Sequence, residues 1–147
     1  MIMVSFDRPE LVIVSKTIDR PAIRLYAEIS NDFNPIHIDP EFAATTPMRC
    51  IIAHGMLSLN LVWQSLRATY GDAAEGAKLD ARFVRPVYED DVVSGGGRLK
   101  PGSTGVYEVF VANQKGEPVI TGTLTFENIE AERTRPYCRM VRGKDTP

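Results

Sequence analysis

The sequence has little cysteine, little net charge and no long hydrophobic run. Its two cysteines, Cys50 and Cys138, are too few and too far apart for a disulfide framework or a cysteine-based zinc site, and they favour a reducing compartment. The net charge of -2 includes no basic excess of the kind that contacts with a phosphate backbone require. Nucleic acid is therefore not an expected partner.

Hydrophobic segments are short and interrupted. Residues 1–15 contain Asp7, Arg8 and Glu10, so they lack the continuous apolar core of a signal peptide. The longest mostly apolar stretch, residues 51–63, is too short to span a bilayer. These absences predict a cytoplasmic protein that does not associate with a membrane.

What the chain does have is an ordinary globular composition, 44% hydrophobic and 24% charged, at a length typical of one compact domain. We expect a single domain over residues 1–130. Residues 131–147 carry several arginines and little periodicity, which is typical of a solvated C-terminal tail.

The first quarter of the chain predicts a strand followed by a helix. The strand is expected over residues 11–18. Asp19 is a favoured helix cap, Pro21 is a favoured early helical residue, and Asn31 tolerates the left-handed backbone that ends many helices.

The next segment predicts a loop. Pro35 disfavours helical backbone at Asn34, so residues 31–38 are expected to be irregular. A second short helix is expected to follow Asp39 and Pro40.

Apolar side chains recur at three-four spacing between residues 52 and 66, which predicts a long helix with one apolar face. Further apolar neighbours widen that face, so the helix is expected to be buried on most sides and to end near Gly71. The face consists of Ile52, Met56, Leu59, Trp63 and Leu66.

The second half of the chain predicts strands, because apolar and polar residues alternate there. The turn at residues 113–116 predicts that the last two strands pair antiparallel. Gly95, Gly96 and Gly97 indicate a bulge or a close backbone approach. The strands are expected at residues 79–83, 92–99, 106–112 and 120–126.

Helices in the first half and strands in the second favour an α+β domain. We expect one mostly buried helix packed against a curved antiparallel sheet.

The chemistry-bearing residues cluster near the two histidines of the chain, His37 and His54. His37 follows Asp32 by five residues, and a carboxylate and an imidazole that share one water can exchange protons with it near neutral pH. Pro35 stiffens the intervening segment, and Asn34 is expected to bond nearby backbone. The same residue types also occur in ordinary surface turns, so spacing alone does not separate the two interpretations.

The segment Ser30-Asn31-Asp32-Phe33-Asn34-Pro35-Ile36-His37, with Ala53-His54-Gly55-Met56 after it, resembles the motif of the MaoC-like (R)-specific enoyl-CoA hydratases. The resemblance implies a hot-dog fold, in which one helix is wrapped by a curved antiparallel sheet. It also implies reversible hydration of a trans-2-enoyl thioester to the (R)-3-hydroxyacyl thioester. The carrier would be coenzyme A or acyl carrier protein, the protein a homodimer, and no metal or redox cofactor would be needed.

The resemblance assigns roles residue by residue. Asp32 and His37 match the pair that activates water, and Asn34 matches the residue that shapes their loop. Gly55 matches the glycine whose backbone N–H receives the thioester oxygen, and a helix start suits that role because its free N–H groups favour negative charge. No catalytic role falls to His54, for which we expect a supporting role at most.

Four residues are candidates for substrate contact: His54, Met56, Trp63 and Arg85. Trp63 stands where some family members have a small hydroxyl residue near the acyl pocket, so its indole would shorten that pocket unless it packs in the core. Arg85 is a candidate for the coenzyme A phosphates, as are the arginines of the tail.

Three alternatives remain open from the sequence. A metal site would gather His37, Asp39, Glu41 and His54, but this is not a recognised ligand spacing, and we rank it below acid-base chemistry. The second alternative is a non-catalytic hot-dog subunit that binds acyl thioesters. The third is a hot-dog thioesterase.

Overall fold

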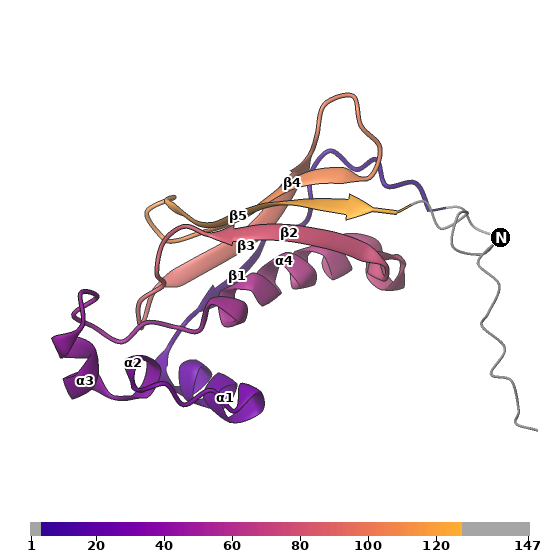
Figure 1. Cartoon of the computed structure of the whole chain (residues 1–147). Coiled ribbons are helices and arrows are strands. Elements are labelled where there is room, and N and C mark those ends of the chain that lie inside the picture. Colours follow the sequence, from indigo (N-terminus) through magenta and orange to yellow (C-terminus); the bar gives the residue numbers. More distant parts are fainter. Residues whose placement is uncertain (1–3, 128–147) are drawn as a thin grey trace, which may run out of the picture.

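The computed structural model describes residues 4–127, so the predicted tail and the boundary at residue 130 lie outside the described residues. The elements follow the chain from indigo to orange in Figure 1. They are β1 (Val14–Thr17), α1 (Arg20–Ser30), α2 (Pro35–Ile38), α3 (Pro40–Thr45), α4 (Gly55–Tyr70), the 3-10 helix η1 (Gly71–Ala74), β2 (Ala77–Phe83), β3 (Val92–Leu99), β4 (Val106–Ala112) and β5 (Pro118–Phe126).

The strands form one five-stranded sheet in the order β1-β3-β4-β5-β2, and all neighbouring strands are antiparallel. Helix α4 runs along one face of the sheet and contacts β3, β4 and β1. Helices α1, α2 and α3 gather beyond the N-terminal end of α4 (Figure 1). The predicted α+β architecture is therefore confirmed. Within residues 4–127, no helix has the length and apolar character that crossing a bilayer requires.

The boundaries of α1 agree with the sequence prediction. The Asp19 side chain accepts a hydrogen bond from the Ala22 N–H at 2.9 Å, and Pro21 stands in the first turn. Asn31 ends the helix in the left-handed region, with φ 54° and ψ 33°. This turn directs the next residue, Asp32, away from the helix axis and toward α4.

The glycines of β3 mark a close approach between the helix and the sheet. A Cβ atom on Gly95 would lie 2.7 Å from the Leu61 Cβ and 2.9 Å from the Leu61 carbonyl carbon. Such contacts are tighter than any side chain tolerates, so the predicted close approach is confirmed. The register irregularity of the sheet lies instead between Val111 and Ala112 of β4.

The prediction of an irregular loop over residues 31–38 was wrong in its second half, because Pro35–Ile38 forms the short helix α2. Asn34 has extended backbone, as expected before a proline. The restriction does not extend beyond Asn34, however, and Pro35 is suited to the first position of a helix. His37 therefore lies on a helical turn.

The long helix begins at Gly55 rather than at residue 52, because Ile52 pairs with Tyr88 in an isolated β-bridge. Its buried face also differs from the prediction. Met56 is 50% exposed and Trp63 is partly buried. The sheet covers one side of α4, where Leu61 packs against Gly95 of β3. The buried positions are Ser58, Leu59, Leu61, Val62, Ser65 and Leu66.

Candidate active site

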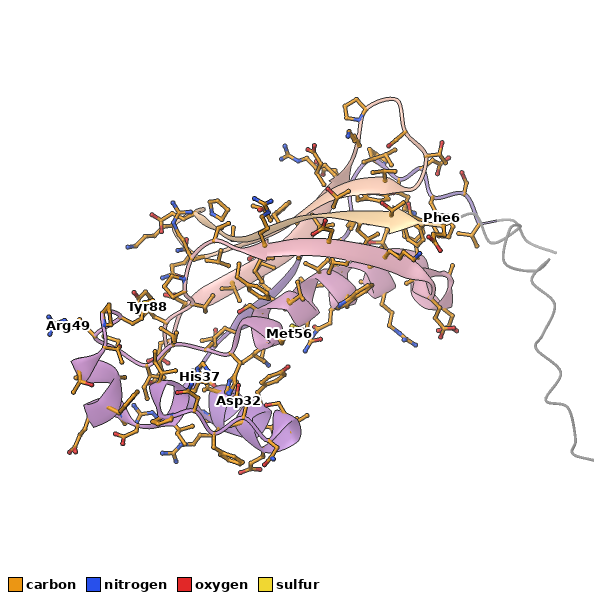
Figure 2. The ribbon with its side chains drawn as sticks, in the orientation of Figure 1. Phe6, Asp32, His37, Arg49, Met56 and Tyr88 are labelled. Atoms are coloured by element: carbon orange, nitrogen blue, oxygen red, sulfur yellow. The ribbon has the colours of Figure 1, made fainter. Side chains whose placement is uncertain are left out.

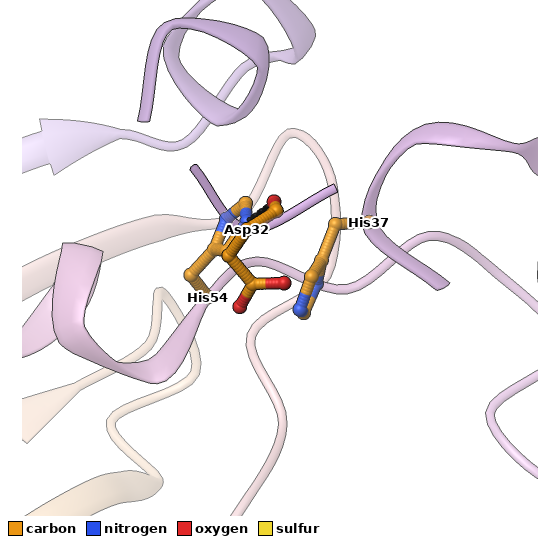
Figure 3. A group of neighbouring side chains, drawn as sticks. All are labelled: Asp32, His37 and His54. Atoms are coloured by element: carbon orange, nitrogen blue, oxygen red, sulfur yellow. Dashed lines mark hydrogen bonds between the residues drawn. The ribbon is translucent and has the colours of Figure 1, made fainter. Parts of the chain in front are cut away.

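Asp32, His37 and His54 lie together at the N-terminal end of α4. One carboxylate oxygen of Asp32 and one ring nitrogen of each histidine all lie within 4.8 Å of one another. Figure 2 shows Asp32 and His37 near Met56, the second residue of α4. Figure 3 shows the Asp32 carboxylate beside the His37 ring. Three segments that are separate in the sequence thus meet at one point.

The backbone of Ile52 orients the His37 ring. Its carbonyl oxygen lies 2.7 Å from the Nδ1 atom of His37. Because a carbonyl can only accept a hydrogen bond, Nδ1 carries the hydrogen. In the neutral ring Nε2 then keeps its lone pair, which is the form that removes a proton from water.

Asp32 is held by its own turn and leaves a carboxylate oxygen available. Its backbone N–H donates to the Ala27 carbonyl at 3.1 Å, and its Oδ1 accepts a hydrogen bond from the Asn34 N–H at 3.2 Å. The side chain is exposed. A separation of up to 4.8 Å from the histidine nitrogens is short enough for one water to bridge the groups.

Asn34 and Pro35 build the turn that carries His37. The Asn34 Oδ1 accepts a hydrogen bond from the Ile36 N–H at 3.2 Å, and its carbonyl accepts from the His37 N–H at 2.9 Å. Pro35 occupies the first helical position. Together they fix the direction in which the His37 side chain leaves the backbone.

His54 connects this loop to the long helix. Its side chain is 4% exposed, and its Nε2–H donates to the Asp32 carbonyl oxygen at 2.9 Å (Figure 3). Its ring stacks on the His37 ring with centroids 3.9 Å apart. The Nδ1 atom has no hydrogen-bond partner within the described residues.

Gly55 is the first residue of α4, so its N–H has no acceptor inside the helix and faces the positive end of the helix dipole. A Cβ atom at this position would lie 2.7 Å from the Phe83 ring. A larger residue here would displace the Phe83 ring, and glycine lets a ligand approach the backbone closely.

A mostly apolar groove of about 560 Å³ runs past this end of α4, and both His37 and Gly55 line it. Met56 and Arg85 also line the groove, and the Arg85 Nη1 donates to the Pro118 carbonyl at 2.9 Å. Trp63 is not among the lining residues and packs against the core instead.

The residues able to hold a metal ion differ from those that the sequence suggested. Among the described residues, Asp32, His37 and His54 are the group whose possible ligand atoms lie close enough together. The Asp39 carboxylate instead accepts hydrogen bonds from the Glu41 and Phe42 N–H groups and caps α3. The near-parallel stacking of the two histidine rings, 29° between planes, is poorly suited to a shared ion, because a metal lies in the plane of each ligating ring.

Sequence reasoning missed two groups at the site. The Ile52 carbonyl, which sets the tautomer of His37, is a backbone atom and leaves no signal in the sequence. Ser58 is buried and lines the groove. Its position three residues after Gly55 places both on one helix face, which is a signal that could have found it.

The family model described as MaoC like domain matches residues 5–126. The chain belongs to the MaoC-like domain family. Over 48 residues it is 46% identical to an (R)-specific enoyl-CoA hydratase of Aeromonas caviae, which is 33% of this chain and 36% of that protein. Over 82 residues it is 35% identical to an (R)-specific enoyl-CoA hydratase of Rhodospirillum rubrum, 55% of this chain and 57% of that protein. The matched segments thus span between about a third and just over half of these relatives.

Solved structures of MaoC-like hydratases share the fold. The R-hydratase PhaJ1 of Pseudomonas aeruginosa superposes with a TM-score of 0.69 at 28% identity, covering 83% of each chain. An (R)-hydratase from A. caviae superposes with a TM-score of 0.66 at 26% identity, covering 80% of this chain and 94% of that one. The predicted hot-dog fold is confirmed.

Proposed function

We propose that the protein catalyses the reversible hydration of a trans-2-enoyl-CoA to the (R)-3-hydroxyacyl-CoA. The observation that carries the proposal is that His37 and Gly55 line one groove while the Asp32 carboxylate lies within 4.8 Å of a histidine nitrogen. His37 and the start of α4 therefore face the same groove, and the Asp32 carboxylate lies close to the histidine rings. The names of the similar hydratases support the direction and stereochemistry of the reaction.

In the proposed mechanism, one water is hydrogen-bonded by Asp32 and by the Nε2 atom of His37. The water oxygen forms a bond to the β-carbon, and its proton passes to this pair. The electron pair of the double bond moves toward the thioester oxygen, which the Gly55 N–H stabilises. The pair then delivers a proton to the α-carbon, and the reverse sequence releases water.

Overall, this reaction adds the elements of water and transfers no electrons to an external acceptor. We therefore propose that it runs without a redox cofactor, and that protonation by Asp32 and His37 replaces the need for a metal. Both expectations follow from the proton-transfer chemistry of Asp32 and His37.

Arg85 is the proposed contact for the phosphates of coenzyme A. It is exposed at the wall of the groove, and within residues 4–127 its Nη1 alone forms a hydrogen bond, to the Pro118 carbonyl. The remaining guanidinium N–H groups suit phosphate oxygens. The predicted homodimer remains a prediction that light scattering of the purified protein would measure.

Purified protein mixed with crotonyl-CoA tests the function directly. We expect loss of the enoyl absorbance without release of free thiol, and the (R) enantiomer of 3-hydroxybutyryl-CoA as product. Release of thiol would replace the proposal with a thioesterase. Binding with neither change would instead indicate a non-catalytic subunit that holds acyl thioesters.

A further inference from the structure

Two serines are buried on α4, and they differ in one respect. Ser58 is 1% exposed and Ser65 is 0% exposed. The Ser65 hydroxyl donates to the Val12 carbonyl. The Ser58 hydroxyl has no hydrogen-bond partner within residues 4–127. One helix thus carries a satisfied and an unsatisfied hydroxyl in equally buried positions.

Ser58 does not use the partner that a serine inside a helix commonly takes, which is the carbonyl one turn earlier. Thr69 does so on the same helix, donating to the Ser65 carbonyl at 2.7 Å. A buried hydroxyl without a partner destabilises the folded state, because it loses its hydrogen bonds to water and gains none in return. An unsatisfied group of this kind is most simply explained by a partner that binds from outside the chain.

The position of Ser58 indicates what that partner is. It follows Gly55 by three residues, so the two share a helix face, and helical side chains lean toward the N-terminus. Both residues line the groove. Met56 and Phe83, also on the groove, are 50% and 54% exposed. Ser58, at 1% exposed, is therefore much more buried than these two residues, and it lies one helical turn after Gly55.

We propose that the Ser58 hydroxyl is a second hydrogen-bond donor to the carbonyl oxygen of the bound acyl thioester. This inference rests on the proposed function and assigns a further catalytic residue to it. Negative charge grows on that oxygen as water adds, so a donor fixed in an apolar, enclosed site stabilises the transition state more than the ground state. Loss of one such donor lowers kcat on the order of 10²-fold.

The test compares Ser58→Ala with Ser65→Ala in the full chain. Steady-state hydration of crotonyl-CoA gives kcat and KM, and infrared spectroscopy follows the carbonyl band of bound butyryl-CoA labelled with ¹³C at the thioester carbon. We expect Ser58→Ala to lower kcat on the order of 10²-fold with little change in KM, and to shift the band to higher frequency. Ser65→Ala should lower the urea midpoint of unfolding, because it removes the hydrogen bond to the Val12 carbonyl, and leave kcat and the band unchanged.

Ser58→Cys provides a second variant, because it keeps nearly the same volume and offers only a weak donor. It should resemble Ser58→Ala in kcat and in the carbonyl band. Wild-type kcat and an unshifted band in both variants would overturn the inference. If the wild-type protein binds butyryl-CoA but does not hydrate crotonyl-CoA, the proposed function fails, and the carbonyl band alone decides the role of Ser58. A protein that does neither overturns both.

Discussion

The buried polar groups at the two ends of α4 differ in whether they have hydrogen-bond partners. At the C-terminal end, Tyr70 and Tyr107 form a closed set of hydrogen bonds with the backbone of Arg8. At the N-terminal end, the His54 Nδ1 and the Ser58 Oγ are buried without partners among the described residues. Because proteins rarely leave buried polar atoms unpaired, the contrast separates an end that stabilises the fold from the end at which we propose that the substrate binds.

Every hydroxyl at the C-terminal end has a partner. The Arg8 N–H donates to the Tyr70 oxygen at 3.1 Å, and the Tyr107 hydroxyl donates to the Arg8 carbonyl at 2.7 Å. The two tyrosine hydroxyls also bond each other. Burial, and then the hydrogen bond to Tyr70, raise the pKa of Tyr107. These hydrogen bonds therefore hold the segment around Arg8 against the core.

The largest effect should follow from changing the acid-base pair. Asp32→Asn and His37→Gln should each lower kcat for enoyl-CoA hydration by roughly 10²- to 10⁴-fold, because neither amide can take up the proton of water. Asp32 is exposed and His37 is half-buried, so the free energy of unfolding in urea should fall by no more than about 1 kcal/mol. Activity within a factor of about three of wild type in either variant, well short of the expected loss, would refute the assignment of the site.

His54 should have an intermediate effect, because it positions Asp32 and does not itself contact the reacting atoms. His54→Ala removes the bond to the Asp32 carbonyl and the stacking on His37. We expect kcat to fall by roughly 10- to 10²-fold, since small displacements of catalytic groups are costly. His54→Gln offers a side-chain N–H to the same carbonyl and should recover part of the loss.

Two measurements separate positioning from a general loss of structure. His54→Ala should lower kcat with little change in KM, since the His37 ring loses the ring stacked 3.9 Å from its own while the groove itself stays in place. Circular dichroism should retain the helix signal of wild type. Equal losses in the Ala and Gln variants, together with a KM that rises as much as kcat falls, would assign His54 a purely structural role.

Much of this arrangement could be predicted from the sequence, because it depends on local rules. Asp19 and Asn31 mark the ends of α1 through capping, and three glycines in β3 mark its approach to α4. The family motif in the sequence already assigns Asp32, His37 and Gly55 to one site. Each of these features can be recognised from the residue type at its own position in the sequence.

The remainder could not be predicted, because it depends on contacts between distant segments. The helical turn at Pro35–Ile38 is fixed by bonds to Asn34 and to the backbone at Ile52. The exposure of Met56 follows from which side of α4 the sheet covers. The link from His54 to Asp32 joins residues 22 apart, and no periodicity in the sequence reports such a bond.

The smallest effect should appear at the opposite end of α4, and it should depend on pH. Tyr107 is 0% exposed, and its pKa is raised above the ordinary tyrosine value of about 10. The neutral phenol is favoured in the folded state, so its contribution to stability is complete below pH about 10 and is lost as pH rises through the raised pKa.

Tyr107→Phe should lower the free energy of unfolding by about 1 kcal/mol at neutral pH, leave kcat unchanged, and flatten the decline in stability above pH about 10. Urea unfolding between pH 7 and roughly pH 11, across the tyrosine range, would show this difference in slope. Parallel curves for wild type and variant would mean that another group controls alkaline unfolding, and a fall in kcat would mean that the two ends of α4 are coupled rather than separate.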